Sequence, residues 1–467
     1  MATKRVSPVD AAWLILEGRD TPMHVGGLFE FTNPPDAPPD YLRQELERMR
    51  SEHTIPRPWN LKLIEGPVVG PRLPLMREDD DIDLDYHVRH SALPKPGGQR
   101  ELGILVSRLH SHQLDLHRPL WELHLIEGLE ENRFAMYLKM HHSLIDGVSG
   151  MRLILRTLST DPDVRGLQAF WTIGEGSKSA REASGNSSSS LLGRVARAMS
   201  ESAETVGGLS RAAVQLGNAR FGDSELSAPY SAPDSLLGGR LGGQRRFATQ
   251  QYDLALIKRL AKAAGGTLND IVLYLSSTAL RRYLLEHGKV PTRSLTAGIP
   301  VNLREADDES AGTAVGMVIA QLATNVADPR QRLNKIKRAT AEAKKHLASL
   351  PPAARTPYTL LMSAPYLTGL MAGLGGRAPV PFNVAISNVP GPPERLYYNG
   401  ARLDAMFPLS LLTHGSALNI TCVSYAGTLN FGFTGARDTL PHLQRLAPYM
   451  REALDELQEV LLESEAA

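Results

Sequence analysis

The chain has 467 residues, of which 51 are Lys or Arg and 50 are Asp or Glu, so its formal net charge is only +1. This balance argues against a partner held mainly by charge, such as nucleic acid, while 42% hydrophobic and 22% charged residues are ordinary for a soluble globular protein. The single cysteine, Cys422, excludes an internal disulfide and a multi-thiolate metal site, and its alternating apolar neighbours indicate a buried side chain rather than a nucleophile.

The first third of the chain combines strand and helix patterns. Apolar residues alternate with period two at residues 25–31, 121–127 and 134–140, which predicts strands. Spacing near 3.6 at residues 101–114 predicts a helix, and a second helix is expected from Gly147 onward. A short apolar patch near the N-terminus ends too early for a secretory signal, so we expect a cytoplasmic protein.

The composition shifts after about residue 165. Residues 174–190 are rich in Gly and Ser and predict a linker, whereas residues 191–216 have amphipathic helical spacing. That helical stretch either bridges two domains or lies at a lipid interface. Beyond it the patterns predict, in order, a strand at 247–254, helices at 256–264 and 268–285, a strand at 295–300, and a hairpin formed by 418–425 and 429–434.

These elements predict an α/β fold with two mixed domains and no internal repeat. We place the first domain at residues 1–165 and the second at residues 245–467, with a flexible and helical linker at residues 166–244. Length alone suggests two or three domains, which agrees with this division.

An uncharged stretch at residues 356–376 is the segment most similar to a membrane span. Its length is about that of a spanning helix, but Pro365 and several glycines interrupt it, and Ser and Thr dilute it. We therefore expect a buried or membrane-facing helix there rather than a span.

One short motif carries most of the chemical information. The predicted strand at 134–140 leads into His141-His142-Ser143-Leu144-Ile145-Asp146-Gly147. A neutral imidazole titrates near ~6.5 and can take a proton from a hydroxyl, an amine or a thiol. We expect Asp146 to fix the turn and Gly147 to permit a backbone conformation that would strain other residues. Two adjacent histidines alone are often coincidental, but the full HHxxxDG pattern at the end of a strand favours a catalytic base.

The HHxxxDG pattern resembles the motif of the CoA-dependent acyltransferase superfamily, which includes chloramphenicol acetyltransferase and peptide-synthetase condensation domains. The resemblance implies that His142 is the general base and that Asp146 is a structural acid, paired with an arginine. It also implies two chloramphenicol acetyltransferase-like, mixed-sheet domains side by side, with an active-site tunnel at their interface.

Further segments narrow the resemblance. They are, in chain order, Pro8-Val9-Asp10-Ala11-Ala12-Trp13-Leu14, Met23-His24-Val25-Gly26-Gly27, Arg118-Pro119-Leu120-Trp121-Glu122, Thr267-Leu268-Asn269-Asp270, Ile299-Pro300-Val301-Asn302-Leu303-Arg304 and Ser387-Asn388-Val389-Pro390-Gly391-Pro392. Together with HHxxxDG they are similar to the bacterial wax ester synthase/diacylglycerol acyltransferase family, over nearly the whole chain.

This resemblance implies an enzyme that transfers a long-chain acyl group from acyl-CoA to a fatty alcohol, a diacylglycerol or both, and so makes neutral lipid for storage. It implies no cofactor and no metal, with acyl-CoA and the acceptor as substrates. Because such substrates barely dissolve in water, peripheral contact with a membrane or a lipid droplet is expected, and a homodimer is possible.

Asn269 and Asp270 stand where the predicted helix at 268–285 begins. Thr267 is the candidate N-cap, so both side chains would lie near the positive end of the helix dipole. Spacing alone favours plain capping. In the resembled family the pair is implicated in activity, and a carboxamide at Asn269 could donate to the oxyanion formed when the thioester is attacked.

The remaining candidates have supporting roles. Arg304 is the best partner for Asp146, because a guanidinium suits a carboxylate, although a surface arginine is an equal alternative. We expect Pro119 and Leu120 to shape a turn and Trp121 to pack in a core, Asn388 to belong to a turn that fixes contacts between domains, and His141 to make a structural hydrogen bond.

Two rival functions stay open. One is a condensation or polyketide-associated acyltransferase that takes its acyl group from a carrier protein, and the other is a non-catalytic lipid-binding protein with the same fold. The chain contains no HExxH zinc motif, no GxSxG nucleophile elbow, no P-loop and no dinucleotide-binding fingerprint.

Overall fold

The computed structural model describes residues 3–6, 8–64, 74–145, 147–174, 226–288, 290–302 and 315–462. Asp146 and Arg304 lie outside these residues, as does most of the predicted linker, including the amphipathic stretch at 191–216.

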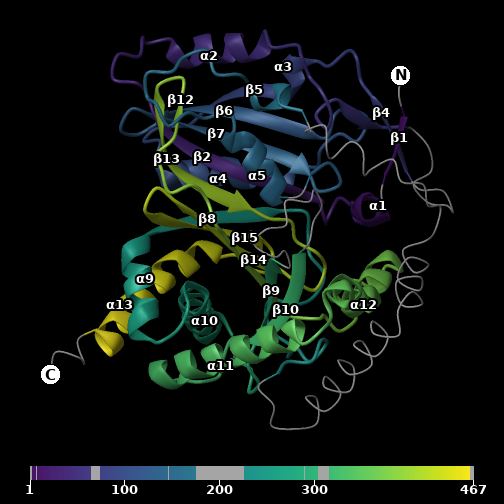
Figure 1. The fold of residues 1–467 in the computed structure, drawn as a ribbon, viewed down its shortest axis with the longest axis vertical. Helices are drawn as coiled ribbons and strands as arrows, with labels where there is room; N and C mark the ends of the chain where they lie inside the picture. The colour runs from purple at the N-terminus through teal and green to yellow at the C-terminus, as the bar shows by residue number, and fades with distance from the viewer. Residues whose placement is uncertain are drawn as a thin grey trace.

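Two six-stranded mixed sheets form the two halves of the molecule (Figure 1). The strand order of the upper sheet in that view is β12-β13-β2-β7-β6-β5, and the β5–β6 pair is parallel while the other neighbours are antiparallel. Its strands are β2 (His24–Thr32), β5 (Val88–Ala92), β6 (Trp121–Leu129), β7 (Arg133–His141), β12 (Tyr397–Tyr398) and β13 (Ala401–Leu409).

Both faces of this first sheet are covered, because its central strands bury residues of both parities. Apolar side chains of one face pack with helices α2 (Tyr41–Arg50) and α5 (Gly147–Leu155), and those of the other face pack with α4 (Gln99–Ser111). The strands predicted at 25–31, 121–127 and 134–140 and the helix predicted at 101–114 are therefore confirmed, with ends shifted by one to three residues.

A smaller three-stranded sheet stands beside the first one. It consists of β1 (Thr3–Arg5), β4 (Leu75–Glu78) and β3 (Leu61–Leu63) in that order, and helix α1 (Pro8–Leu16) follows its first strand. Two short helices, α3 (Leu84–His87) and the 3-10 helix η1 (Phe170–Thr172), complete this half. A small apolar cluster joins Ala11 and Leu14 of α1 to Leu120 and Leu144, on either side of the histidine pair.

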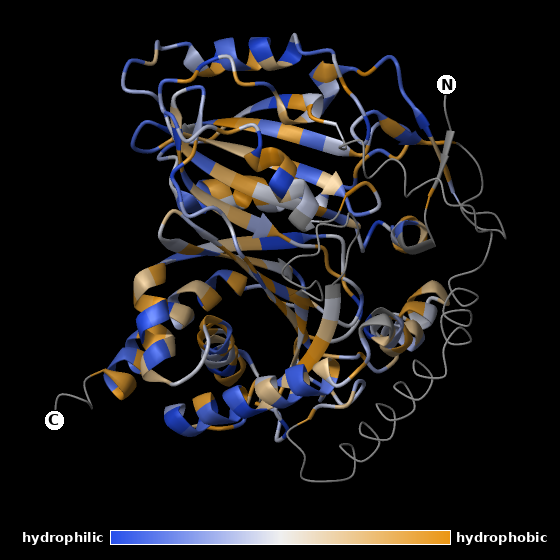
Figure 2. Cartoon of the chain, viewed as in Figure 1, coloured by the Kyte–Doolittle hydropathy of each residue, from blue (hydrophilic) through white to orange (hydrophobic). Residues whose placement is uncertain are grey.

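The second sheet has the order β10-β9-β11-β14-β15-β8, with parallel pairs on both sides of β11. Its elements are β8 (Arg245–Asp253), α9 (Leu254–Ala263), α10 (Leu268–His287), β9 (Thr296–Asn302), β10 (Val315–Gln321), α11 (Pro329–Ala348), α12 (Pro352–Met371), β11 (Val384–Val389), β14 (Leu418–Tyr425), β15 (Thr428–Ala436), the 3-10 helix η2 (Leu443–Arg445) and α13 (Leu446–Leu461). Figure 2 shows how largely apolar α10 is, and side chains from nearly all sides of this helix are buried. The elements predicted between 247 and 300 and the hairpin at 418–434 are confirmed, whereas β10, β11, β13, α11 and α13 were not anticipated.

Strands β12 and β13 cross from the second half of the chain into the first sheet, where β13 pairs with β2 along Gly26–Thr32. The domains predicted at residues 1–165 and 245–467 are each continuous in the chain, so they do not include the crossing of β12 and β13 into the first sheet. β13 also lies close to β15, because a Cβ built at Gly432 would stand only 1.9 Å from the carbonyl oxygen of Pro408. The two halves are thus joined by backbone pairing as well as by side chains.

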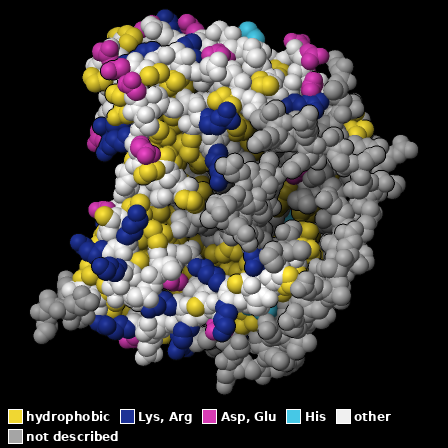
Figure 3. Space-filling model, viewed as in Figure 1, with side chains coloured by type: hydrophobic (Ala, Val, Ile, Leu, Met, Phe, Trp, Pro, Cys, Tyr) yellow, Lys and Arg dark blue, Asp and Glu magenta, His cyan; other side chains and the backbone are white. Residues whose placement is uncertain are grey.

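The uncharged stretch at 356–376 forms most of α12 and the turn after it. Within the described part of the chain, no helix is both long and apolar enough to cross a membrane. On the face drawn in Figure 3, acidic and basic side chains are interspersed among apolar ones, in keeping with the balanced net charge.

Candidate active site

The histidine pair stands at the end of β7, between the ends of its two neighbouring strands. The backbone N–H of His141 donates to the carbonyl oxygen of Leu120 at 2.9 Å, just before β6. The backbone N–H of His142 donates to the carbonyl oxygen of Met23 at 2.9 Å, just before β2. The sheet therefore fixes the backbone of both histidines, as expected of a site built on rigid elements.

His141 points into the protein and is 1% exposed. Its Nδ1 lies 2.6 Å from the Ser143 hydroxyl and accepts the Ser143 backbone N–H at 3.1 Å. Its Nε2 lies 3.4 Å from Oε2 of Glu17, a carboxylate whose side chain is only 5% exposed. His141 thus closes the turn after β7.

His142 is half-buried, and its ring packs against the indole of Trp13. The ring centroids are 4.4 Å apart and the planes are inclined by 35°. This contact holds the His142 ring against α1. Neither Trp13 nor Glu17 was predicted to have a role, although their i, i+4 spacing places them on one side of a helix.

The Pro119-Leu120-Trp121 segment supports the pair from the β6 side. Leu120 and Trp121 are fully buried, and the Leu120 carbonyl holds His141 as described. The indole N–H of Trp121 donates to the carbonyl oxygen of Trp59 at 2.8 Å, and its ring stacks on Trp171 with centroids 5.2 Å apart. Trp121 is a core residue.

Gly147 begins α5 without a positive φ, and a Cβ added to it would meet no described atom within 4 Å. The prediction that this position needs glycine to avoid backbone strain is therefore wrong. Gly147 itself is exposed at the start of α5.

Asp270 caps α10. Its Oδ2 accepts from the Thr267 backbone N–H and hydroxyl, both at 2.8 Å, while Oδ1 accepts from the Thr340 hydroxyl at 2.7 Å. The neighbouring Asn269 has a buried Nδ2 without a hydrogen-bond partner among the described residues. The oxyanion role of Asn269 stays a prediction.

Asn388 ends β11 together with Val389, and the turn begins only at Pro390. Val389 packs against the apolar cluster that also receives Leu144 and Ile145 of the histidine turn. The end of β11 thus contributes to the same apolar cluster as the histidine turn.

A buried polar layer lies behind the pair, on the face of the first sheet that α4 covers. Lys139 reaches Glu122 at 3.3 Å, and His124 reaches the same carboxylate at 3.3 Å. Burial opposes ionisation of Glu122, yet the His124 hydrogen bond and the charges of Lys139 and Arg89 lower its pKa to about 2. Glu122 is therefore a buried anion that neutralises Lys139.

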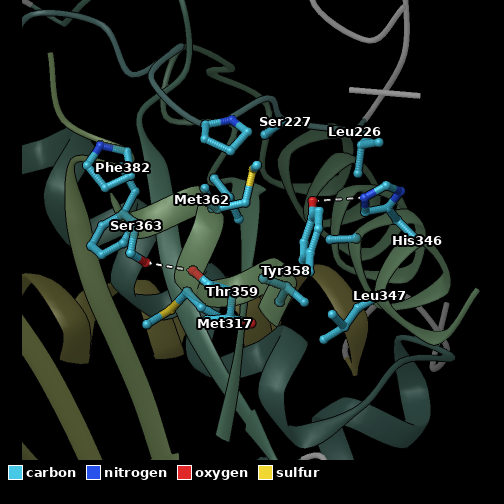
Figure 4. Close-up of a pocket in the computed structure, with 15 residues that line it drawn as sticks. Leu226, Ser227, Met317, His346, Leu347, Tyr358, Thr359, Met362, Ser363 and Phe382 are labelled. Atoms are coloured by element: carbon cyan, nitrogen blue, oxygen red, sulfur yellow. Dashed lines mark hydrogen bonds between the residues drawn. The ribbon is translucent and has the colours of Figure 1, made fainter. Parts of the chain in front are cut away.

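Two apolar cavities lie apart from the His141–His142 pair. Figure 4 shows the first, where Tyr358 and Met362 of α12 face Met317 of β10 and Leu347 of α11. At its edge the Tyr358 hydroxyl lies 2.9 Å from Nε2 of His346. The second cavity lies in the first half, between the sheet and α5, and its lining includes Met136, Leu138, Ile154, Leu158 and Phe170. Neither lining includes His141 or His142.

No group of three or more His, Cys, Asp or Glu side chains in the described ranges is arranged to hold a metal ion.

Comparison with known families gives two adjoining matches. A family model described as the wax ester synthase/diacylglycerol acyltransferase catalytic domain matches residues 6–272, and one described as the WS/DGAT C-terminal domain matches residues 311–458.

Relatives match along almost the whole length. A Mycobacterium tuberculosis protein named as a probable diacylglycerol O-acyltransferase is 44% identical over 455 residues, covering 97% of this chain and 98% of its own. The Acinetobacter baylyi O-acyltransferase WSD is 37% identical over 464 residues, covering 98% of each chain.

Solved structures agree with this assignment. The wax ester synthase/diacylglycerol acyltransferase from Marinobacter aquaeolei superposes with a TM-score of 0.79 at 37% identity, over 98% of this chain and 99% of its own. The first condensation domain of the CDA synthetase has a TM-score of 0.57 at 16% identity, over 99% and 96% of the two chains, which is similarity of fold alone.

Proposed function

Because the chain belongs to the wax ester synthase/diacylglycerol acyltransferase family, we propose that it transfers a long-chain acyl group from acyl-CoA to the hydroxyl of a fatty alcohol, a diacylglycerol or both. It is an O-acyltransferase with an α/β fold of two mixed-sheet halves. The observation that carries the mechanism is the pair His141 and His142, held between the Leu120 and Met23 carbonyls with one ring turned inward and the other packed on Trp13.

His142 is the general base. His141 is nearly inaccessible and its Nδ1 accepts hydrogen bonds within the turn, whereas His142 is only half-buried and is therefore the more accessible of the two rings. His142 takes the proton of the acceptor hydroxyl while that oxygen attacks the thioester carbonyl. The tetrahedral intermediate then collapses, the C–S bond breaks, and the imidazolium returns its proton to the departing CoA thiolate.

The indole of Trp13 stabilises the imidazolium stage of this cycle. A cation over an indole face gains about 0.5–2 kcal/mol, and here the two ring centroids are 4.4 Å apart. Asp146 and Arg304 as a structural pair, and Asn269 as an oxyanion donor, remain predictions from the family resemblance.

The cavity beneath α12 suits an aliphatic chain. Its lining is mostly apolar, with Ser227, His346, Thr359 and Ser363 as the polar members, a pattern typical of small-molecule sites.

The outer face of α12 is a candidate contact with a lipid surface. Leu361 and Met371 of α12, and Leu374 after it, are 39–51% exposed, and residues 356–376 carry no charge. Helix α1 contacts α12 and adds Ile15, which is 42% exposed. One helix thus has an apolar outer face and an inner face that lines a cavity, so a lipid substrate could pass from a lipid surface into the protein.

Thiol release from palmitoyl-CoA tests the function. Purified protein is assayed with hexadecanol, with dioleoylglycerol and with neither, and the His142→Ala variant serves as the control. We expect acceptor-dependent release that the variant loses by about 10²-fold or more, because a general base typically contributes 10²–10⁴-fold in rate.

Two outcomes would contradict the proposal. Release by His142→Ala at the wild-type rate would exclude His142 as the base. Absence of release with every acceptor, in protein shown to be folded by circular dichroism, would favour a carrier-bound acyl donor or a binding role, and an acyl-carrier protein assayed in parallel separates these two.

A further inference from the structure

Glu17 is a buried carboxylate that takes no direct part in the proposed reaction. Its side chain is 5% exposed, just after the end of α1. Oε2 accepts the backbone N–H of Met23 at 2.5 Å, and Oε1 accepts from Nε2 of Gln113 at 2.8 Å. The third neighbour is Nε2 of His141, 3.4 Å from Oε2. Burying a carboxylate costs free energy unless polar groups pair with it, and the neighbours of Glu17 provide that pairing.

The hydrogen bonds of His141 determine its tautomer. The backbone N–H of Ser143 can only donate, and it points at Nδ1 of His141 at 3.1 Å. Nδ1 must therefore present its lone pair, and the proton of the neutral ring resides on Nε2. Among the described residues Nε2 makes no hydrogen bond, and Glu17 is the described acid within ion-pair distance of it, at 3.4 Å. Glu17 thus favours the tautomer that the turn requires.

The same segment also touches His142. Glu17 holds the N–H of Met23, and the carbonyl of Met23 holds the N–H of His142 at 2.9 Å. Trp13, one helical turn before Glu17, packs on the His142 ring. The apolar cluster of Ala11 and Leu14 with Leu120 and Leu144 anchors this segment against the turn. Residues 11–23 therefore contact both histidines of the pair.

We propose that Glu17 is a positioning residue for the reaction: it holds His141 as the Nε2-protonated tautomer, and so keeps the turn that presents His142 to the substrate. This inference rests on the proposed function. Glu17 does not touch the reacting atoms, and it acts through His141 and Met23.

The isosteric variant Glu17→Gln tests the proposal. Its carboxamide oxygen can still accept from Met23 and face Nε2 of His141, but the negative charge that favours a proton on Nε2 is gone, and the NH₂ group then faces the NH₂ group of Gln113. We expect kcat to fall about 10- to 100-fold with KM for palmitoyl-CoA within about twofold of wild type, a loss typical of an outer positioning partner. The matched control is Glu127→Gln, which removes a carboxylate 3.3 Å from His90 at the surface and should leave kcat unchanged.

The tautomer itself is measured by ¹⁵N NMR of histidine-labelled wild-type protein, with the His141 signals assigned by their loss in His141→Gln. The inference predicts an Nε2-protonated ring, shifted towards the other tautomer in Glu17→Gln. An Nδ1-protonated ring in the wild type, or a Glu17→Gln variant with wild-type kcat, would overturn it. The NMR result needs no turnover and no variant of Glu17, so it stands even if Glu17→Gln does not fold. An inactive wild type would instead refute the proposed function.

Discussion

Burial sets the protonation states of two histidines, His24 and His110, that lie behind the His141–His142 pair. Their rings are 4.6 Å apart, and Nε2 of His24 donates to the carbonyl oxygen of His110. His110 in turn accepts from the Tyr137 hydroxyl at 2.8 Å. Burial lowers the pKa of His110 to about 3, and burial together with the neighbouring His110 lowers the pKa of His24 well below its usual value. Both rings are therefore neutral at cellular pH.

Acid should destabilise the protein through His110. The unfolded side chain binds a proton below about pH 6.5, whereas the folded one stays neutral until about pH 3, so the free energy of unfolding falls as pH falls through this window. Between pH 7.5 and 5.5 the loss is about 1.4 kcal/mol for this residue. Urea unfolding of wild type and His110→Gln at both pH values should show their stability difference shrinking by about that amount.

The control for this measurement is Ile104→Ala on the same helix, because this side chain is 56% exposed and carries no titratable group. Its stability difference from wild type should be the same at both pH values. A His110→Gln difference that does not change with pH would contradict the assignment of a buried neutral histidine.

At the scale of elements, β13 decides how the two halves meet. It pairs with β2 in the first sheet and lies against β15 of the second, where Gly432 leaves room for the Pro408 carbonyl. A tight backbone approach of this kind is a reason for glycine inside a strand, where it otherwise weakens the sheet.

Gly432→Ala should therefore destabilise the protein. A methyl group at 1.9 Å from a backbone oxygen forces the strands apart, and overpacking of this kind costs about 1–3 kcal/mol. Gly369→Ala is the matched control, because an added Cβ on α12 meets nothing within 4 Å and alanine suits a helix better by about 0.5–1 kcal/mol. Urea unfolding of both variants measures the two effects, and equal stabilities would contradict the role of Gly432.

In the molecule as a whole, the candidate lipid contact on α12 and the helix that packs on His142, α1, lie side by side. The apolar outer face of α12 lies next to α1, and the residues that contact the two histidines are Trp13 of α1 and Glu17 just after it. A lipid surface bound to this side would therefore be near both the cavity beneath α12 and the histidine turn.

Vesicle binding tests this arrangement. Met371→Asp/Leu374→Asp should reduce co-sedimentation with phosphatidylcholine vesicles that contain dioleoylglycerol by about tenfold or more, because half-exposed apolar side chains of this size each contribute on the order of 1 kcal/mol. Ile104→Asp, on α4 and 56% exposed, is the matched control and should bind as wild type. Equal binding of all three proteins would exclude α12 as the contact.

Much of the fold follows from local patterns that the sequence displays directly. The strands β2, β6 and β7 and the helix α10 were predicted within one to three residues at each end, because their periodicity is a property of neighbouring residues. The strands β11 and β13 were missed, since their pairing partners lie far away in the chain and their own patterns are weak.

By itself, the sequence determined the motif at 141–147, its place at the end of a strand, and the family to which the chain belongs. Only the tertiary structure decided that Trp13 and Glu17 reach the histidine pair and that β13 joins the two sheets, while Gly147 proved to need no special backbone. The reason is physical: periodicity and capping act between residues a few positions apart, whereas these contacts exist only once segments more than 100 residues apart have packed together.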